Sequence, residues 1–418
     1  MTQVSTVQST IDPSSKWQPR FWTIAIGQAL SLAGSQITQF VLLWWITSTT
    51  NSTAALATAG IVGLLPQALL GPLGGVLADR FSRRLLLIIS DAISAICIVV
   101  LIILFATNSV QLWHVYTMMF IRSTMQAFQR PAFDASVPNI VPTDFIPKMS
   151  GISQGFLGII TIVAAPLGAV VLAILPLQAA LMIDVVTAVL AITTLLMYHI
   201  PQPLETQNKT SSVWTDFKEG VSYVTRDSGL LSLYILLGIV VFLITQANIL
   251  TPLLVKQLFG GGPNEIALLS VMSGVGLILG GVLASVLPQR RPILTMIIFF
   301  AIGCVAVSLT ALAPVFWLAL VGWTFYGMGF SVGNAKMFTL LATVVPNQIQ
   351  GRTISLLTTI MGVVGPLGLL IAGPLGETIG VRGVFVWGGL LSAVICVLWL
   401  FMPAIHKLEQ TNNKTSTS

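Results

Sequence analysis

Charged side chains are scarce in this sequence. They make up 8% of its 418 residues, whereas an ordinary soluble protein carries about 25%. Hydrophobic residues make up 55%, too large a share for a folded surface that stays dissolved in water. This composition excludes a soluble globular protein and indicates that lipid surrounds much of the folded chain.

Cysteine and histidine are equally sparse, with three of each. Cys97, Cys304 and Cys396 lie inside apolar stretches, at spacings that suit neither a disulfide framework nor a metal site. The histidines form no cluster along the chain, and no Gly-Lys dipeptide exists from which a phosphate-binding P-loop could be built. We therefore expect no cofactor and no metal, and we disfavour an intramembrane enzyme and an ATP-driven pump.

Apolar stretches long enough to cross a bilayer fill most of the chain. A transmembrane helix needs about twenty mostly apolar residues. We predict twelve spans, six on each side of a polar segment, at 21–46, 55–78, 85–106, 112–130, 149–174, 177–199, 229–254, 265–287, 293–312, 315–341, 353–376 and 382–403. The predicted fold class is an all-α membrane protein.

The polar segments divide the chain into five predicted parts. In the longest polar segment, apolar residues recur at helical spacing, which predicts an amphipathic helix over 213–226. The predicted parts are a cytoplasmic N-terminal segment 1–20, a six-helix bundle 21–199, a cytoplasmic linker 200–228, a second six-helix bundle 229–403 and a cytoplasmic tail 404–418.

Basic residues fall almost entirely on one side of the predicted spans. That side carries Lys16, Arg20, Arg80, Arg83, Arg84, Arg130, Lys148, Lys209, Lys218, Arg226, Arg290, Arg291, Arg352, Lys407 and Lys414. The other side carries only Lys256 and Arg382. For a multi-pass protein of a plasma (bacterial inner) membrane, the positive-inside rule then places both termini in the cytoplasm. The net charge of +6 is thus a signal of topology, and we expect no nucleic-acid partner.

The two halves of the chain share landmarks. The string Gly74–Ala78 recurs as Gly280–Ala284, and each copy is followed by an arginine cluster. Membrane chains built from two related halves place a binding site between them. The repeat therefore predicts a transporter and disfavours a channel. We expect a monomer, because one chain of this kind encloses its own cavity.

The stretch from Gly75 to Arg84 reads Gly-Val-Leu-Ala-Asp-Arg-Phe-Ser-Arg-Arg. It resembles the signature between spans two and three of the major facilitator superfamily, with Ser82 where that signature has glycine. In the second half, Ser285 replaces the acid. The resemblance implies the major facilitator fold, with 12 transmembrane helices in two pseudo-symmetric six-helix bundles that open alternately to the two sides of the membrane.

Further segments look like the macrolide-efflux branch of this superfamily: Phe120-Ile121-Arg122-Ser123, Pro131-Ala132-Phe133, Ile183-Asp184-Val185 and Gly351-Arg352. The resemblance implies a secondary active transporter that exports amphiphilic small molecules, such as macrolide-like drugs, by proton antiport, and so confers drug resistance. Siderophores or endogenous metabolites are the alternative substrates. Met125-Gln126 departs from the antiporter signature of the superfamily.

The same resemblance implies a conformational latch made of Asp79, Arg80, Arg83, Arg84 and Arg352. The carboxylate of Asp79 is expected to meet the N-terminus of the span that begins near Arg352, where unpaired N–H groups and the helix dipole favour an anion. Arg83 and Arg84 either tie the loop to carboxylates or lipid headgroups, or only fix the topology.

Four charged residues lie within predicted spans: Asp91, Arg122, Asp184 and Lys336. A charge at the bilayer centre costs at least about 2.5 kcal/mol on insertion scales, so such residues face a partner or a wet cavity. We assign Asp91, Arg122 and Asp184 to proton coupling, and the alternative for each is a structural role between helices. Lys336 either reaches the cytoplasmic surface along its apolar stem or lines the cavity.

Polar side chains on otherwise apolar spans predict the substrate cavity. A largely apolar pocket with a few polar groups suits a bulky amphiphile. The spacing of Gln28, Gln36 and Gln39 places them on one helix face. The candidate cavity residues are Gln28, Gln36, Gln39, Arg122, Gln126, Gln154, Gln246, Asn248, Phe330, Asn334 and Lys336.

Overall fold

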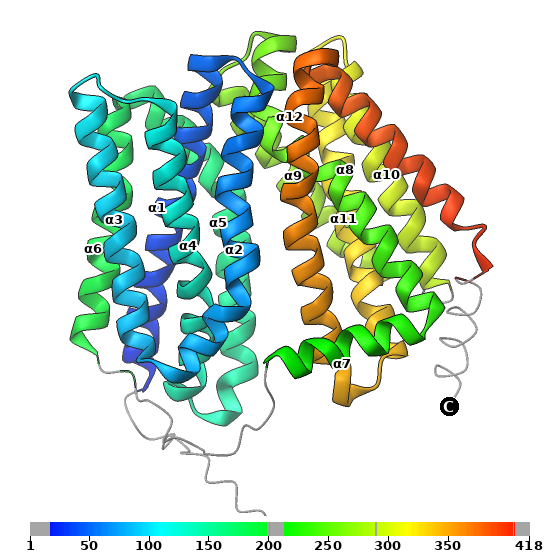
Figure 1. Ribbon diagram of the computed structural model, residues 1–418, viewed down its shortest axis with the longest axis horizontal. Coiled ribbons are helices and arrows are strands. Elements are labelled where there is room, and N and C mark those ends of the chain that lie inside the picture. Colours follow the sequence, from blue (N-terminus) through cyan, green and yellow to red (C-terminus); the bar gives the residue numbers. More distant parts are fainter. Residues whose placement is uncertain (1–16, 199, 201–212, 289–290, 404, 406–418) are drawn as a thin grey trace, which may run out of the picture. The chain divides into compact units, whose positions relative to one another are not determined.

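The computed structural model describes residues 17–198, 200, 213–288, 291–403 and 405, and these form helices and no strand (Figure 1). The predicted all-α fold is confirmed. Helices suit a lipid environment because every backbone N–H and C=O inside them is paired within the same segment. Of the polar segments predicted at the two ends and in the middle of the chain, 1–16, 201–212, 404 and 406–418 lie outside the described residues.

The first half of the chain forms six long helices, each close to a predicted span. They are α1 (Trp17–Thr50), α2 (Thr53–Arg80), α3 (Arg83–Ala106), α4 (Leu112–Ser136), α5 (Ile146–Ile174) and α6 (Leu177–Met197). Two short 3₁₀ turns, η1 (Val137–Asn139) and η2 (Thr143–Phe145), join α4 to α5.

The second half begins with α7 (Val213–Arg226), which lies in the range predicted for an amphipathic helix and runs crosswise to the long helices that follow it (Figure 1). The long helices are α8 (Ser228–Phe259), α9 (Pro263–Val286), α10 (Pro292–Leu312), α11 (Phe316–Val344) and α12 (Asn347–Trp399). Inside α12, Gly380 has φ 76° and ψ 159°, a conformation open to glycine and rarely to other residues. It separates two helices that correspond to the last two predicted spans.

Ten helices of the described chain are long and apolar enough to cross a membrane. The α4 helix is not one of them, because charged and other polar residues along it lower its hydropathy. Its 25 residues extend over about 37 Å, which exceeds the hydrocarbon thickness of a bilayer. Adding α4, and counting α12 as two helices, accounts for the twelve predicted spans.

Helix ends follow local sequence signals. Asp227 precedes α8, and its Oδ1 accepts hydrogen bonds from the N–H groups of Gly229 at 2.8 Å and Leu230 at 2.9 Å. Gly260 ends the same helix in the left-handed conformation, with φ 63°. These signals set where the helix starts and stops without reference to its neighbours.

Packing divides the described chain into two compact units. Unit 1 comprises the described residues of Met1–Val41, Pro66–Ala164 and Ile174–Thr210, and unit 2 those of Leu42–Leu65, Ala165–Ala173 and Ser211–Ser418. The division runs through α1, α2 and α5, so the α1–α2 turn belongs to unit 2. The domain boundaries predicted at 21–199, 200–228 and 229–403 stay predictions.

Within each unit, a few helix pairs make most of the contacts. In unit 1, α3 packs against α4 and α6. In unit 2, α8 packs against α12, α11 packs against α9 and α10, and α7 lies on α8 and α12. The position of α3 between α4 and α6 matters most for the site, because each of these three helices carries a buried charge.

Close approach of α10 and α11 depends on glycine. A Cβ atom built on Gly329 would stand 2.7 Å from the backbone nitrogen of Gly303, a distance that real Cβ contacts do not show. We expect Gly329→Ala to destabilise the folded protein by about 1–3 kcal/mol, as overpacked cores do. Thermal denaturation in detergent measures the change. Gly71→Ala is the matched control, because a Cβ there meets nothing within 4 Å, and equal melting temperatures for the two variants would contradict the expectation.

Candidate functional site

One face of α1 carries polar side chains into the interior of unit 1. Gln28, Ser31 and Ser35 follow one another at intervals of three and four, which places them on the same side of the helix. Gln28 and Ser31 are buried, and Ser35 is partly buried. Buried polar groups need hydrogen-bond partners, and this face finds them on α3 and α6.

Asp91 of α3 is 2% exposed. Its carboxylate accepts hydrogen bonds from Gln28 Nε2 at 3.0 Å, Ser31 Oγ at 2.7 Å and Gln129 Nε2 at 2.8 Å. The Gln129 amide also reaches Gln28 Oε1, at 3.2 Å. All three donors to the carboxylate are neutral, so these bonds orient Asp91 without neutralising it.

Arg122 of α4 forms an ion pair with Asp184 of α6, and both side chains are 4% exposed. Ser35 Oγ adds a hydrogen bond to the other oxygen of Asp184, at 3.1 Å. The Nε of Arg122 is buried and has no hydrogen-bond partner among the described residues. One donor of the guanidinium is therefore buried and unsatisfied in this conformation.

We call these seven residues the polar cluster of unit 1: Gln28, Ser31, Ser35, Asp91, Arg122, Gln129 and Asp184. Its three ionisable side chains carry a formal net charge of −1, the sum of two carboxylates and one guanidinium. A buried net charge is costly at membrane depth. Uptake of one proton by a carboxylate brings the cluster to neutrality.

Lys336 is not part of the polar cluster. It belongs to α11 in unit 2, is 2% exposed, and donates from Nζ to the carbonyl of Leu287 at 3.1 Å. Of the other candidate cavity residues on α11, Asn334 donates to the carbonyl of Phe330 at 2.9 Å, and Phe330 packs against Phe300 with ring centroids 5.5 Å apart. The contacts of Phe330, Asn334 and Lys336 described here are therefore all with other residues of unit 2.

The other predicted cavity residues have mixed surroundings. Gln246 of α8 is buried and donates to the carbonyl of Leu243 at 2.7 Å, while Asn248 is exposed and donates to the Tyr326 hydroxyl at 2.8 Å. Gln36, Gln39 and Gln126 are partly buried. The side chain of Gln154 lies outside the described residues.

The arginines after α2 bind backbone carbonyl groups at helix ends. Arg83 donates from Nη1 to Ala135 O at 2.5 Å, near the end of α4, and lies 3.5 Å from Asp79. Arg84 donates to Leu195 O at 2.6 Å and Leu196 O at 3.0 Å, at the end of α6. Helix C-termini favour cations because their last carbonyls are unpaired. Asp79 belongs to the same loop as Arg83, so the predicted tie of Arg83 and Arg84 to other carboxylates or to lipid headgroups stays a prediction.

Two further residues of the predicted latch region have defined neighbours. Ser82, which departs from the superfamily signature, accepts a hydrogen bond from Leu85 N at 3.3 Å and caps α3. Arg352, at the start of α12, pairs with Glu219 of α7. Arg80 is exposed. Asp79 and Arg352 belong to different units, so the contact predicted between Asp79 and the start of α12 stays a prediction.

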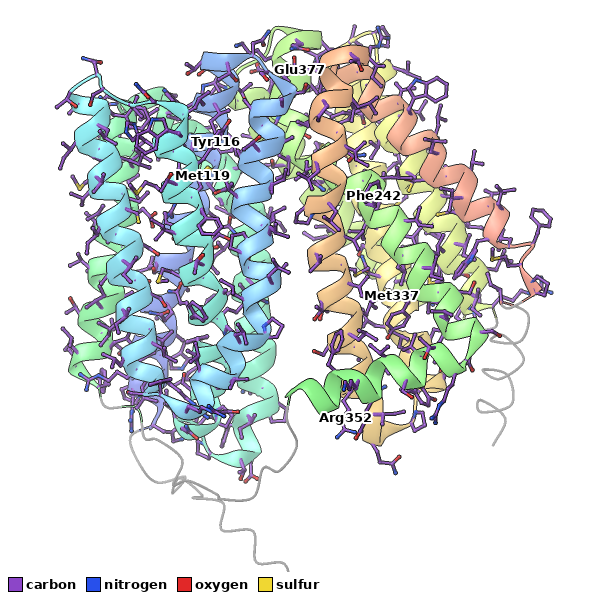
Figure 2. The ribbon with its side chains drawn as sticks, viewed as in Figure 1. Tyr116, Met119, Phe242, Met337, Arg352 and Glu377 are labelled. Atoms are coloured by element: carbon purple, nitrogen blue, oxygen red, sulfur yellow. The ribbon has the colours of Figure 1, made fainter. Side chains whose placement is uncertain are left out.

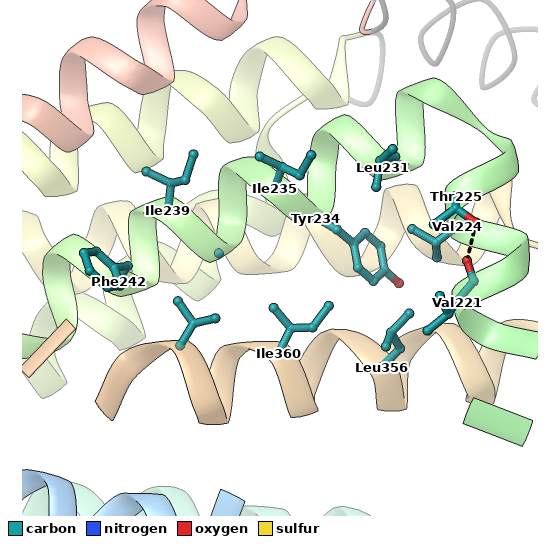
Figure 3. Close-up of a pocket in the computed structure, with 12 residues that line it drawn as sticks. Val221, Val224, Thr225, Leu231, Tyr234, Ile235, Ile239, Phe242, Leu356 and Ile360 are labelled. Atoms are coloured by element: carbon teal, nitrogen blue, oxygen red, sulfur yellow. Dashed lines mark hydrogen bonds between the residues drawn. The ribbon is translucent and has the colours of Figure 1, made fainter. Parts of the chain in front are cut away.

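An apolar pocket of about 410 Å³ lies between α7, α8 and α12 in unit 2 (Figure 3). Ile235 and Phe242 of α8 and Ile360 of α12 line it. The hydroxyl of Tyr234 at its edge donates to Thr353 O at 2.8 Å. A pocket with such walls accepts an apolar group and offers little for a charged one.

Sequence reasoning found each charged member of the polar cluster but missed several of its neutral partners. Gln129 follows Arg122 by seven residues, and Ser31 and Ser35 follow Gln28 by three and seven, so each lies on the same helix face as a predicted residue. That spacing was the available signal. Serine and glutamine are common in membrane helices for many reasons, so the signal alone does not select them.

Twelve spans that hold buried charges away from lipid define a multi-pass membrane protein, and buried charges of this kind are typical of membrane transport proteins. A family model described as Major Facilitator Superfamily matches residues 24–368 and 248–417. The chain belongs to the Major Facilitator Superfamily, and it is a transporter rather than an enzyme.

Individual relatives agree with this membership. The chain is 30% identical to Macrolide efflux protein A of Streptococcus pyogenes over 400 residues, which cover 94% of this chain and 98% of the relative. It is 22% identical to Multidrug efflux pump Tap of Mycolicibacterium fortuitum over 396 residues, covering 90% and 94% of the two chains. The predicted resemblance to the macrolide-efflux branch is thus confirmed.

A solved structure shows the same fold. A bacterial homologue of the human lysosomal transporter Spinster, in an inward-facing and unoccupied conformation, superposes with a TM-score of 0.68 at 14% identity. The match covers 97% of this chain and 99% of that one. At this identity the likeness concerns the fold alone.

Proposed function

We propose that this transporter exports amphiphilic small molecules of the macrolide kind across a plasma (bacterial inner) membrane, in exchange for protons. It acts as a monomer with both termini in the cytoplasm and alternates between inward-open and outward-open states. The relatives that are named for macrolide and multidrug efflux support the substrate class. The observation that carries proton exchange is the buried polar cluster with a formal net charge of −1.

Asp91 is the member of the cluster best suited to carry the proton. Its partners are two amides and a hydroxyl, so protonation breaks no ion pair. Protonation of Asp184 would instead leave the guanidinium of Arg122 buried without an anion, and an unpaired buried charge is strongly unfavourable. Because Ser31 and Ser35 lie on one face of α1 and reach the two carboxylates, a proton on Asp91 would also alter how α1 is held between α3 and α6.

Arg122 has a second role in this proposal. Its pairing with Asp184 fixes the position of the guanidinium, and its buried, unpartnered Nε would donate to a polar group of the substrate or to water when the helices around it separate. The substrate surface would further include Gln36, Gln39 and Gln126 in unit 1 and Asn248 in unit 2. The latch of Asp79 with the start of α12 would stabilise the state that is closed to the cytoplasm.

Transport by vesicles with an imposed pH gradient tests the proposal. Purified protein in vesicles with an acidic interior should accumulate a labelled macrolide beyond the amount trapped by protein-free vesicles, since proton efflux would drive substrate inward. Collapse of the gradient with nigericin should bring accumulation down to the protein-free value. Uptake that continues after collapse would refute proton exchange, and uptake of a siderophore or metabolite in place of the macrolide would refute the substrate class.

A further inference from the structure

Glu377 of α12 accepts hydrogen bonds from the start of α2 within unit 2. A single oxygen, Oε1, accepts hydrogen bonds from Ser52 Oγ at 2.6 Å, Thr53 Oγ1 at 3.0 Å and the backbone N–H of Ala54 at 3.0 Å. The first N–H groups of a helix have no partner inside it, and the helix dipole favours an anion there. The carboxylate thus satisfies an unpaired donor of α2 and ties α2 to α12.

Lys256 of α8 donates hydrogen bonds to the end of α1, at the same α1–α2 turn. Its ammonium group donates to Thr47 O at 3.0 Å and to Ser48 O at 3.2 Å, within the last turn of α1. The negative end of the helix dipole favours a cation at this position, although Thr47 O also accepts a hydrogen bond from Asn51 N at 3.2 Å. An acid at the start of α2 and a base at the end of α1 therefore hold the α1–α2 turn with matching charges, and we call Glu377 and Lys256 the clasp.

The helices pack closely beneath the clasp. A Cβ built on Gly376 would stand 2.7 Å from the side chain of Thr53, and one built on Gly373 would stand 3.1 Å from Ala57 Cβ. Ala57 is 2% exposed as a result. The glycines let α2 approach α12 so closely that the contact excludes water one turn below the clasp.

The clasp lies at the opposite end of the first helix within α12 from Arg352. Glu377 and Arg352 stand at opposite ends of the first helix within α12 (Figure 2). Arg352 belongs to the basic side of the predicted topology, so Glu377 belongs to the side with few basic residues, which the proposed topology places outside the cell. Both clasp contacts are at least partly exposed to water. Water screens such contacts, so they hold the turn and still release it in each transport cycle.

We propose that Glu377 and Lys256 form a gate that keeps the extracellular end of the transport pathway closed, and that it opens when the α1–α2 turn leaves α8 and α12. This inference extends the proposed function, since it assumes that the protein is a transporter with alternating access. Its readout needs neither substrate nor protons. Failure of the gate is therefore distinguishable from failure of proton exchange.

Labelling of a cysteine at position 57 tests the gate. Ala57→Cys places a thiol under the clasp, and the native Cys97, Cys304 and Cys396 are buried and give a low background. A membrane-impermeant maleimide is applied to intact cells and, separately, to inside-out vesicles. We expect Glu377→Ala or Lys256→Met to raise the labelling rate from the cell exterior roughly tenfold, because loss of the clasp shifts the population toward the open end.

Matched variants distinguish loss of the clasp contacts from a nonspecific destabilisation of the folded protein. Glu377→Gln should raise labelling less than Glu377→Ala, because its amide oxygen still accepts the same three hydrogen bonds. Glu265→Gln is the control acid, since Glu265 caps its own helix through Gly262 N at 2.7 Å and the described residues show no clasp contact for it. Arg382→Met is the control base, because Arg382 is exposed on the same side of the predicted topology. Neither control should change the rate.

The outcomes decide between the proposals. Parental labelling rates in Glu377→Ala and Lys256→Met, with full labelling of an exposed Asn51→Cys thiol, would overturn the gate. If Glu377→Ala elutes as an aggregate in size-exclusion chromatography, the labelling rates of Glu377→Gln and Lys256→Met alone decide the test. Increased labelling from inside-out vesicles alone would overturn the proposed orientation and leave the clasp as the closing contact at that end.

Discussion

Replacing Asp91 with asparagine is expected to reduce gradient-driven accumulation of substrate to the level seen without a gradient. Asparagine keeps the size of the side chain and one acceptor oxygen for its three donors, but it does not bind and release a proton. We expect the loss of driven transport to be roughly a hundredfold or more, since no other carboxylate of the cluster is free of an ion pair. Uptake of labelled macrolide into acid-loaded vesicles measures it.

Exchange without a gradient separates a coupling defect from a binding defect. Vesicles loaded with unlabelled substrate should still take up labelled substrate through Asp91→Asn, because alternating access remains and only the proton is missing. Asp134→Asn provides the control, because Asp134 is an exposed carboxylate of α4. Full gradient-driven uptake by Asp91→Asn would assign the proton to another residue, and loss of exchange as well would indicate a role for Asp91 in folding or binding.

The second large effect is expected from the ion pair between Arg122 and Asp184. Arg122→Met leaves two buried carboxylates with a formal charge of −2, whereas Asp184→Asn leaves one carboxylate and one guanidinium with a charge of 0. Removal of one partner of a buried pair costs about 3–5 kcal/mol. We therefore expect both single variants to lower thermal stability, with the larger loss in Arg122→Met. Thermal denaturation in detergent provides the measurement.

The double variant, Arg122→Met with Asp184→Asn, returns the cluster to its original charge of −1 through Asp91. We expect it to be more stable than Arg122→Met, since no charge is left without the partner it had. A double variant as unstable as the sum of the two single losses would contradict coupling between them. If the stable double variant transports substrate, the pair is structural. If it folds without transporting, Arg122 contacts substrate or takes part in coupling.

The positions of the spans were predictable because the signal is local. Lipid demands about twenty consecutive apolar residues, and α3 and α10 begin and end within two residues of their predictions. The α4 helix was harder, since Arg122 and Arg130 lower its hydropathy while neighbouring helices bury Arg122. The two spans of α12 were predicted as separate, and the structure places Gly380 between them.

The candidate site was predictable as a set of residues but not as a set of contacts. Asp91, Arg122 and Asp184 stand out because charge is rare and costly in membrane spans. Their pairing does not follow from the sequence, since Asp91 and Asp184 were both candidate partners for Arg122. The structure pairs it with Asp184 and surrounds Asp91 with neutral donors. That difference is the reason for proposing Asp91 as the residue that carries the proton.

The contacts of the clasp, like those of the polar cluster, could not be predicted from the sequence. Lys256 appeared in the sequence only as one of two basic residues on the poorly charged side, and Glu377 carried no signal at all. Both contact the α1–α2 turn, more than 200 residues earlier in the chain. Hydropathy and helix signals act over neighbouring residues, so by itself the sequence determined the helices, their number and the residues too costly to face lipid. Which helix faces meet depends on side-chain packing between distant segments, and only the tertiary structure decided the partners of each buried or clasping charge.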